Sequence, residues 1–189
     1  MAAQKESNLD KLLKRGALDT AQGVIGWRLY RKEGDSSLTG GVIVETEAYS
    51  EEDAASHSYR GKTPRTEVMF GPAGRMYVYF TYGMHWCMNI VTGEDGHGEA
   101  VLIRAIEPDK GTELMRKRRD NRPDKELANG PAKVCQALAI DGSDNGKQLN
   151  NNGILLLEPE EQEKHKVKAT ERIGIRHDTH RLWRFVADY

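Results

Sequence analysis

The chain has 189 residues, of which 38% are hydrophobic and 30% are charged, and its formal net charge is −1 at pH 7. This length predicts one domain, 1–189, with its own core, and we expect the polar residues 1–7 to be disordered. The near-neutral charge excludes a uniformly basic nucleic-acid-binding protein, so such binding would need positive charge gathered on one face.

The sequence also lacks the features of several other protein classes. No apolar run approaches the ~18 residues of a membrane-spanning helix, and no secretory signal is visible at the N-terminus. Cys87 and Cys135 lie in apolar contexts and are expected to be buried free thiols. No Cys–His cluster has zinc spacing, and no phosphate loop is present. We therefore predict no metal, no cofactor and no membrane contact, in a reducing intracellular compartment.

The first elements predicted along the chain are helices at 8–16 and 19–26, then strands at 27–31 and 41–49. The strand at 41–49 is unusual because it ends in Glu45, Glu47 and Tyr49. Side chains alternate along a strand, so these three would share one face. Two interpretations stay open. The strand is either a sheet edge with a solvated acidic face, or the wall of a site in which a carboxylate acts as a general base.

A long polar segment at 50–65 follows, and loops of this length are typical of functional sites or of disorder. It contains His57, for which simple exposure is the alternative to a role. Strands at 75–81 and 86–92 then form a hairpin. Tyr82 lies at its tip, where a large ring would project into solvent, and Asn89 lies among apolar residues, where a buried amide needs partners.

The second half of the chain alternates strands and helices. We predict strands at 99–106, 154–158 and 183–186, a helix with a basic end at 109–122, and a helix at 132–140 that begins after Asn-Gly-Pro. The start of this last helix could hold a phosphate, with Lys133 beside it. The order of elements predicts an α+β fold: one compact domain with a curved, mainly antiparallel sheet, a protruding β-hairpin and flanking helices.

Two groups of motifs resemble a known family. The first comprises Val-Glu-Thr-Glu-Ala-Tyr at 44–49, Ala-Ser-His-Ser at 55–58 and Thr-Pro-Arg at 63–65. The second comprises Tyr-Val-Tyr-Phe-Thr-Tyr-Gly-Met at 77–84, Cys-Met-Asn at 87–89, and Gly-Pro with a lysine and Cys-Gln-Ala-Leu at 130–138. Together they resemble the alkyladenine (3-methyladenine) DNA glycosylases, the vertebrate-type methylpurine glycosylases. The resemblance runs from about residue 17 to residue 186.

This resemblance implies a role for individual residues. Glu47 would be the general base that activates the attacking water, with Arg104 and the backbone carbonyl of Ile175 holding that water. The residues implied to bind the extruded base are Tyr49, His57, Tyr79 and Asn89, the last by clashing with the 2-amino group of normal guanine. The residues implied to bind DNA are Tyr82, which would fill the gap in the duplex, and Met84, Arg65, Gly130 and Lys133.

The implied activity is excision of 3-methyladenine, hypoxanthine and related purines from double-stranded DNA by a monomeric, monofunctional glycosylase that leaves an abasic site. No lysine stands in place of Glu47, so a lyase step is not expected, and Glu45 is expected to make a structural ion pair. Such an enzyme would act in the cytoplasm (the nucleoid) of a bacterium or in the nucleus of a eukaryote. The alternatives are a nucleoside N-ribohydrolase and a non-catalytic lesion-binding module.

Overall fold

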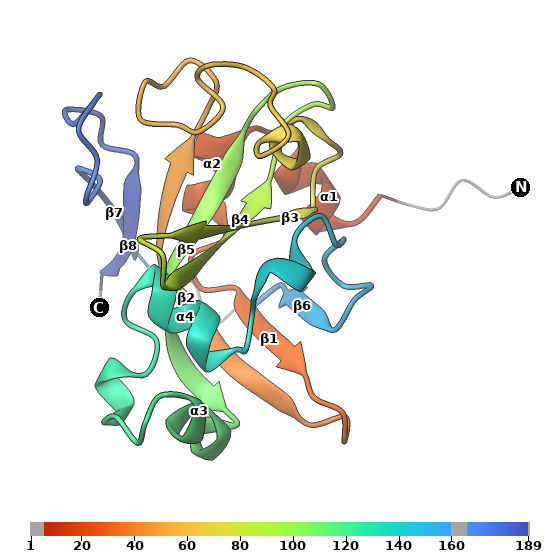
Figure 1. The fold of residues 1–189 in the computed structure, drawn as a ribbon, viewed down its shortest axis with the longest axis vertical. Coiled ribbons are helices and arrows are strands. Elements are labelled where there is room, and N and C mark those ends of the chain that lie inside the picture. Colours follow the sequence, from red (N-terminus) through yellow and green to blue (C-terminus); the bar gives the residue numbers. More distant parts are fainter. Residues whose placement is uncertain (1–5, 160–165, 189) are drawn as a thin grey trace, which may run out of the picture.

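The computed structural model describes residues 6–159 and 166–188, which fold around one eight-stranded sheet (Figure 1). The sheet order is β3-β4-β5-β2-β1-β6, and β8 joins β2 to β7. The strands are β1 (Arg28–Lys32), β2 (Leu38–Tyr49), β3 (Met76–Thr81), β4 (His85–Val91), β5 (Ala100–Lys110), β6 (Ile154–Leu157), β7 (Lys166–Thr170) and β8 (Arg184–Asp188). All strand pairs within the described residues are antiparallel, in agreement with the predicted α+β fold with a mainly antiparallel sheet.

Four short helices lie against this sheet. They are α1 (Asn8–Leu13), α2 (Ala17–Gly23), α3 (Thr112–Arg118) and α4 (Pro131–Ala137), with 3-10 turns η1 (Glu67–Phe70), η2 (Asp124–Glu126) and η3 (Gly142–Asp144). Helix α4 packs on β4 and β5, whereas α2 packs on β2 and β5. Pro131 is the first residue of α4, where its missing N–H costs nothing. In the part of the chain that the structure describes, no helix is long and apolar enough to cross a membrane.

Strand β2 is the centre of the sheet and pairs with β1, β5 and β8. Its first half lies so close to its neighbours that a Cβ on Gly41 would come within 1.9 Å of the Glu107 carbonyl oxygen. Glycine is therefore required there by backbone contact. Because β2 is central, the interpretation of its acidic end as a solvated sheet edge is wrong, and its acidic side chains belong to an interior wall.

The pairing of β2 with β5 shifts by one residue on each side of Glu45. Glu45 pairs with Ala105 and Thr46 pairs with Ile103, so that Arg104 has no partner of its own on β2. Shifts of this kind re-aim a side chain and increase the local twist, and they are common beside active sites. Here the residue without a partner is Arg104, and its guanidinium contacts both Glu45 and Glu47 of β2.

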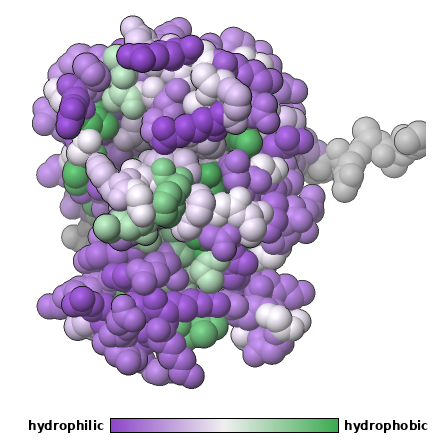
Figure 2. Space-filling view, viewed as in Figure 1, coloured by the Kyte–Doolittle hydropathy of each residue, from purple (hydrophilic) through white to green (hydrophobic). Residues whose placement is uncertain are grey.

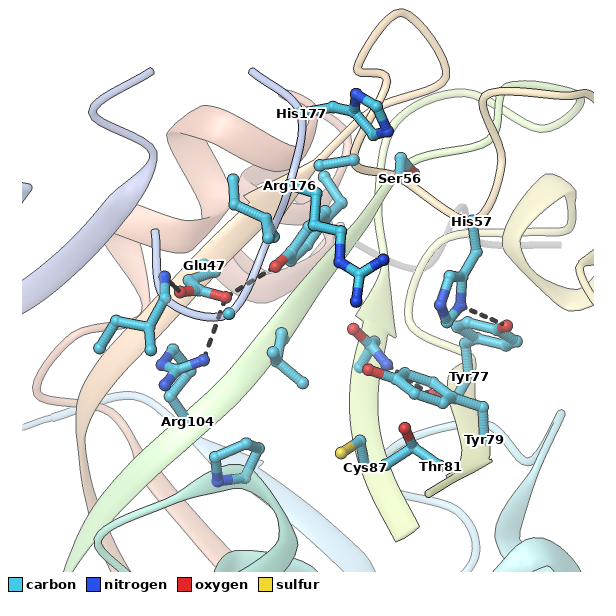
Figure 3. A pocket seen from close by; sticks show the side chains of 18 of the residues that line it. Glu47, Ser56, His57, Tyr77, Tyr79, Thr81, Cys87, Arg104, Arg176 and His177 are labelled. Atoms are coloured by element: carbon cyan, nitrogen blue, oxygen red, sulfur yellow. Dashed lines mark hydrogen bonds and ion pairs between the residues drawn. The ribbon is translucent and has the colours of Figure 1, made fainter. Parts of the chain in front are cut away.

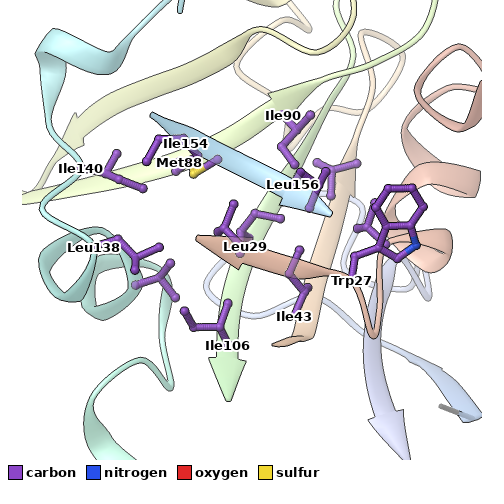
Figure 4. Close-up of a cluster of buried hydrophobic side chains, with 14 of the residues drawn as sticks. Trp27, Leu29, Ile43, Met88, Ile90, Ile106, Leu138, Ile140, Ile154 and Leu156 are labelled. Carbon is purple, nitrogen blue, oxygen red and sulfur yellow. The ribbon is translucent and has the colours of Figure 1, made fainter. Parts of the chain in front are cut away.

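The hydrophobic core lies between the sheet and the helices (Figure 4). Leu29 of β1, Ile43 of β2 and Met88 of β4 are fully buried in it, and Leu138, just after α4, packs into the same cluster. Each such side chain contributes roughly 1.5–3 kcal/mol on burial. The core therefore fixes the relative positions of β2, β4 and α4, which are the elements that carry the polar groups described below.

The β3–β4 hairpin projects from the sheet and carries exposed apolar side chains. Tyr82 is 85% exposed, Met84 68% and Phe80 47%. Figure 2 shows apolar residues interrupting the mostly hydrophilic surface along the middle of the molecule, over this hairpin. Tyr82 and Gly83 both have positive φ, 52° and 66°, and the Met84 amide donates to the Thr81 carbonyl, as in a type I′ turn. Tyrosine is an unfavourable residue at this position.

Several predicted boundaries differ from the structure. The helix predicted at 109–122 begins only at Thr112, because β5 continues to Lys110, and it ends at Arg118. Strand β7 is absent from the predicted elements because its sequence is mostly polar and exposed. Its extended conformation depends on antiparallel pairing with β8. Ser7 caps α1 through a capping box. Residues 1–5 and most of the acidic segment at 159–163 lie outside the described residues.

Candidate active site

A cavity of about 560 Å³ opens beside the acidic end of β2. Its walls come from β2, from the loop that follows β2, from the β3–β4 hairpin, from β5, from the start of α4 and from the loop that precedes β8. Its lining residues include Glu47, Tyr49, Ala55, His57, Tyr77, Tyr79, Tyr82, Cys87, Asn89, Arg104, Pro131, Ile173, Ile175, Arg176 and His177. Segments far apart in sequence therefore meet at one hollow, which includes all four predicted base-binding residues.

Glu47 is fully buried at the side of this cavity and is held by three donors. The Tyr49 hydroxyl donates to one carboxylate oxygen at 2.7 Å, and the Arg104 guanidinium lies 3.2 Å from the same oxygen. The backbone N–H of Ile173 donates to the other oxygen at 2.8 Å (Figure 3). These contacts fix the carboxylate in one orientation. The Arg104 contact is an ion pair, yet the carboxylate still lines the cavity together with the aromatic rings.

Glu45 does not line the cavity and makes the structural ion pair that the sequence predicts. One of its oxygens accepts from Arg104 Nε at 2.7 Å and from Arg184 Nε at 2.6 Å. Partial burial would raise the pKa of this carboxyl, but the two guanidinium groups outweigh that effect and hold the pKa below its usual range. Glu45 therefore anchors Arg104 from behind while Arg104 faces Glu47.

The opposite side of the cavity is aromatic (Figure 3). The rings of His57 and Tyr79 meet edge to face with their centroids 4.5 Å apart, and the His57 Nδ1 and the Tyr77 hydroxyl share a hydrogen bond of 3.0 Å. Removal from water, followed by the charge of Arg65, lowers the pKa of His57 to about 4. Burial raises the pKa of both Tyr77 and Tyr79. This wall is therefore uncharged near neutral pH and can stack on a flat ring.

Asn89 projects into the cavity from β4 with only 5% of its surface exposed. Its amide nitrogen donates to the Tyr77 carbonyl at 3.0 Å, and this bond gives the buried amide the hydrogen-bond partner that it needs. The amide is thereby fixed against the aromatic wall, where it can test the edge of a bound ring for shape and hydrogen bonding.

A strap, defined here as residues 172–178, crosses the cavity from the other side. Arg172 is fully buried and pairs with the equally buried Asp53, and it also donates to the Ala48 carbonyl at 3.0 Å. Its guanidinium lies 4.8 Å from the centre of the Tyr49 ring. Ile173, which supplies the N–H to Glu47, follows directly. Sequence reasoning singled out only Ile175 in this segment and missed the roles of both Arg172 and Ile173.

Ile175, which the sequence resemblance singled out, also lines the cavity. The strap residue that contacts Glu47 is Ile173, through its backbone N–H, so the water-holding role of the Ile175 carbonyl remains a prediction. Within residues 6–159 and 166–188, no group of three or more histidine, cysteine, aspartate or glutamate side chains could hold a metal ion.

Comparison with known proteins decides the family. A sequence profile described as "Methylpurine-DNA glycosylase (MPG)" matches residues 11–189. The chain belongs to the methylpurine-DNA glycosylase family. The chain is 50% identical over 164 residues to a protein of Carboxydothermus hydrogenoformans, covering 85% of this chain and 84% of the relative. It is 46% identical over 172 residues to a protein of Agrobacterium fabrum, covering 91% and 84%. Both relatives are named "Putative 3-methyladenine DNA glycosylase".

Family membership confirms the resemblance stated from the motifs. This methylpurine-DNA glycosylase family member is a monofunctional DNA glycosylase, a hydrolase that acts on DNA in DNA repair. The family assignment therefore favours neither of the two alternatives, the free-nucleoside hydrolase and the non-catalytic module. It leaves open which groups of the cavity perform the chemistry.

Of the predicted DNA-binding residues of this glycosylase, only Tyr82 is among the described residues that line the cavity. Tyr82 and Met84 are exposed on the hairpin, and the Arg65 guanidinium lies 5.7 Å from the centre of the Tyr79 ring. Gly130 precedes the first turn of α4, and the Lys133 ammonium donates to the Asn129 side chain at 2.7 Å. Their contacts with DNA remain predictions.

Proposed function

We propose that this DNA glycosylase extrudes a damaged purine from duplex DNA and hydrolyses its N-glycosidic bond with a water molecule that Glu47 activates. The observation that carries the proposal is the position of Glu47, a fixed carboxylate facing a hollow with an aromatic wall. A base must leave the helical stack before an enzyme can act on it, at a cost of a few kcal/mol. Stacking on aromatic side chains, at about 1–3 kcal/mol per base, offsets that cost.

The proposed chemistry follows from the charge on the sugar. As the bond between C1′ and the base nitrogen lengthens, the sugar becomes positively charged, and a nearby carboxylate stabilises it. The same carboxylate accepts the proton of the attacking water. Arg104 keeps the carboxylate in place, since its own position is fixed by Glu45. The product would be an abasic site.

The proposed substrates are 3-methyladenine, hypoxanthine and related alkylated or deaminated purines. The names of the relatives support the first of these. The Asn89 amide supports selection among purines, because it is fixed at the cavity wall where it can clash with the 2-amino group of normal guanine. We propose that the protein acts as a monomer, with Tyr82 filling the gap that the extruded nucleotide leaves.

The test is Glu47→Gln, which keeps the shape of the side chain but removes its charge and basicity. A labelled duplex with a single hypoxanthine or 3-methyladenine is incubated with excess enzyme and then cleaved with alkali at abasic sites. We expect the single-turnover rate to fall by about 100-fold or more. Glu52→Gln, the same exchange on an exposed residue outside the cavity, is the matched control. Excision by Glu47→Gln at the parent rate would overturn the proposal.

A further inference from the structure

The strap brings a second arginine to the cavity. Arg176 lines it, and in Figure 3 its guanidinium extends into the space between Glu47 on one side and Tyr79 on the other. No hydrogen bond or ion pair with another described residue engages this guanidinium. The other arginine among the described residues that line the cavity, Arg104, differs in this respect because it pairs with Glu45 and Glu47. Arg176 therefore has a full set of free donors aimed at the place where a base would stack.

The backbone on both sides of Arg176 is anchored. Towards the N-terminus, the Ile173 N–H is bonded to Glu47, and the buried Arg172 is paired with Asp53. Towards the C-terminus, the Asp178 carboxylate accepts from the Ala54 N–H at 3.0 Å and lies 3.4 Å from Arg181. The side chain can change its rotamer, but the point from which it extends over the cavity is fixed.

The charges around the cavity make the position of Arg176 selective for neutral over positively charged bases. Glu47 is the only carboxylate among the described residues that line it. Arg176 lines the cavity, and a second cation, Arg65, lies over the Tyr79 ring without being among the lining residues. A base that already carries a positive charge meets repulsion there, whereas a neutral base with acceptor atoms on its edge does not.

Guanidinium geometry specifies which acceptors fit. Arginine has five N–H donors in a planar fork and no acceptor, and it pairs in bidentate fashion with the O6 and N7 atoms of a purine. Hypoxanthine presents both atoms. Adenine derivatives present an amino group in place of O6, so a guanidinium cannot pair with both positions.

We propose that Arg176 is a specificity-determining residue that favours neutral 6-oxopurines such as hypoxanthine by donating hydrogen bonds to O6 and N7. This rests on the function proposed above and deepens it. As the C1′–N9 bond breaks, its electron pair passes to the purine and spreads towards O6 and N7. The guanidinium stabilises this negative charge without giving up a proton. Water forms the new bond to C1′, its proton goes to Glu47, and the departing base later takes a proton from solvent.

The experiment compares two lesions under single-turnover conditions. One substrate is a duplex with a single hypoxanthine, and the other is methylated duplex DNA from which released 3-methyladenine is measured by chromatography. The variants are Arg176→Ala and Arg176→Lys, which keeps the charge but loses the planar fork. The control is Arg122→Ala, which removes an exposed arginine outside the cavity. Thermal unfolding of each variant verifies that the fold is retained.

We expect Arg176→Ala to lower the rate for hypoxanthine by about 10- to 100-fold and to change the rate for 3-methyladenine by less than about threefold. Arg176→Lys should fall between the parent and Arg176→Ala, and Arg122→Ala should affect both lesions equally. Equal losses on both lesions with Arg176→Ala, or no loss on either, would overturn the proposal.

Failure of the underlying function looks different. A parent enzyme that excises 3-methyladenine but not hypoxanthine overturns the role of Arg176 and leaves the chemistry of Glu47 intact. A parent enzyme that excises neither lesion, or a Glu47→Gln variant as fast as the parent, overturns both proposals.

Discussion

The hydroxyl of Tyr49 donates a hydrogen bond to the carboxylate of Glu47, with 2.7 Å between the two oxygens. The two residues are two positions apart on β2, so the strand itself places them on one face. Burial, together with the neighbouring charge of Glu47, raises the pKa of Tyr49, so the hydroxyl stays protonated and remains a donor at neutral pH. One ring thus lines the cavity and also orients the carboxylate.

Tyr49→Phe separates these two roles, because the ring stays and the hydrogen bond is lost. Hydrogen bonds to charged groups contribute about 1.5–3 kcal/mol, which corresponds to a loss of roughly 10- to 100-fold. We expect the single-turnover rate on a hypoxanthine duplex to fall by about tenfold or more while the affinity for the duplex changes little. A fall in affinity with an unchanged rate would contradict the orienting role and indicate that the hydroxyl contacts DNA.

Tyr82 occupies a backbone position that disfavours it, since its φ of 52° suits asparagine or glycine. Tyr82→Asn should therefore raise the free energy of unfolding by about 0.5–1 kcal/mol, as measured in urea. The same variant should excise hypoxanthine from duplex DNA at least tenfold more slowly, with a smaller loss on single-stranded DNA. Unchanged excision would contradict the wedge role, and a lower free energy of unfolding would contradict the backbone strain at Tyr82.

Short-range pattern was enough to predict part of this site. Glu47 and Tyr49 share a strand, and Tyr79 and Asn89 lie on the two strands of one hairpin, so strand alternation and hairpin pairing bring them together. The motif resemblance then assigned their roles. Local pattern does not give the strand order, in which β2 is central, and it is therefore equally compatible with an exposed acidic edge.

The strap shows what local pattern could not supply. The Arg172–Asp53 pair and the Ile173–Glu47 hydrogen bond join residues more than a hundred positions apart. The local sequence of the strap does not indicate which distant carboxylates its residues contact. The burial of Arg172 points to a paired carboxylate, because arginine is almost never fully buried unless it is paired, but that burial is visible only in the structure.

Asn89 is predicted to exclude normal guanine. Asn89→Ser shortens the side chain and removes the amide that is fixed against Tyr77. We expect this variant to release guanine from undamaged duplex DNA at a rate that the parent does not reach, measured by chromatography of the released bases. Asn151→Ser, which changes an exposed amide outside the cavity, is the control. Unchanged guanine release with intact hypoxanthine excision would show that another group discriminates.

His57 has a pKa of about 4, and the sign of its effect on stability follows from this. The unfolded chain binds a proton with a pKa near ~6.5. As the pH falls from 6.5 towards 4, His57 therefore binds a proton in the unfolded state but stays neutral in the folded state. The free energy of unfolding decreases as a result. His57→Gln should lose less stability than the parent between pH 7 and pH 4.5.

Because His57 is an exposed residue, solvent screening should keep this difference below about 1 kcal/mol. The measurement is urea unfolding of both proteins at the two pH values. The neutral ring also predicts that the excision rate shows no ionisation of His57 between pH 5 and 8. A step in the parent's pH profile near 6.5 that His57→Gln abolishes would contradict a neutral ring.

The Arg172–Asp53 pair should dominate the stability of the strap, because both side chains are fully buried. Asp53→Asn leaves the guanidinium charge buried without a counter-ion, which typically costs about 3–5 kcal/mol. For a chain of this length the melting temperature should fall by roughly 6–20 °C. Excision should fall as well, since the strap holds Ile173 against Glu47. Asp124→Asn, which breaks the exposed pair with Arg116, should leave the melting temperature essentially unchanged.

The double variant Asp53→Asn/Arg172→Met tests the cause of this loss. Methionine removes the unpaired charge and keeps much of the volume, so the double variant should be more stable than Asp53→Asn alone. Its excision rate should nevertheless stay low, because the bond from Arg172 to the Ala48 carbonyl and its stacking on Tyr49 are also gone. If the double variant is less stable than the single one, packing of the arginine side chain, and not its uncompensated charge, accounts for the effect.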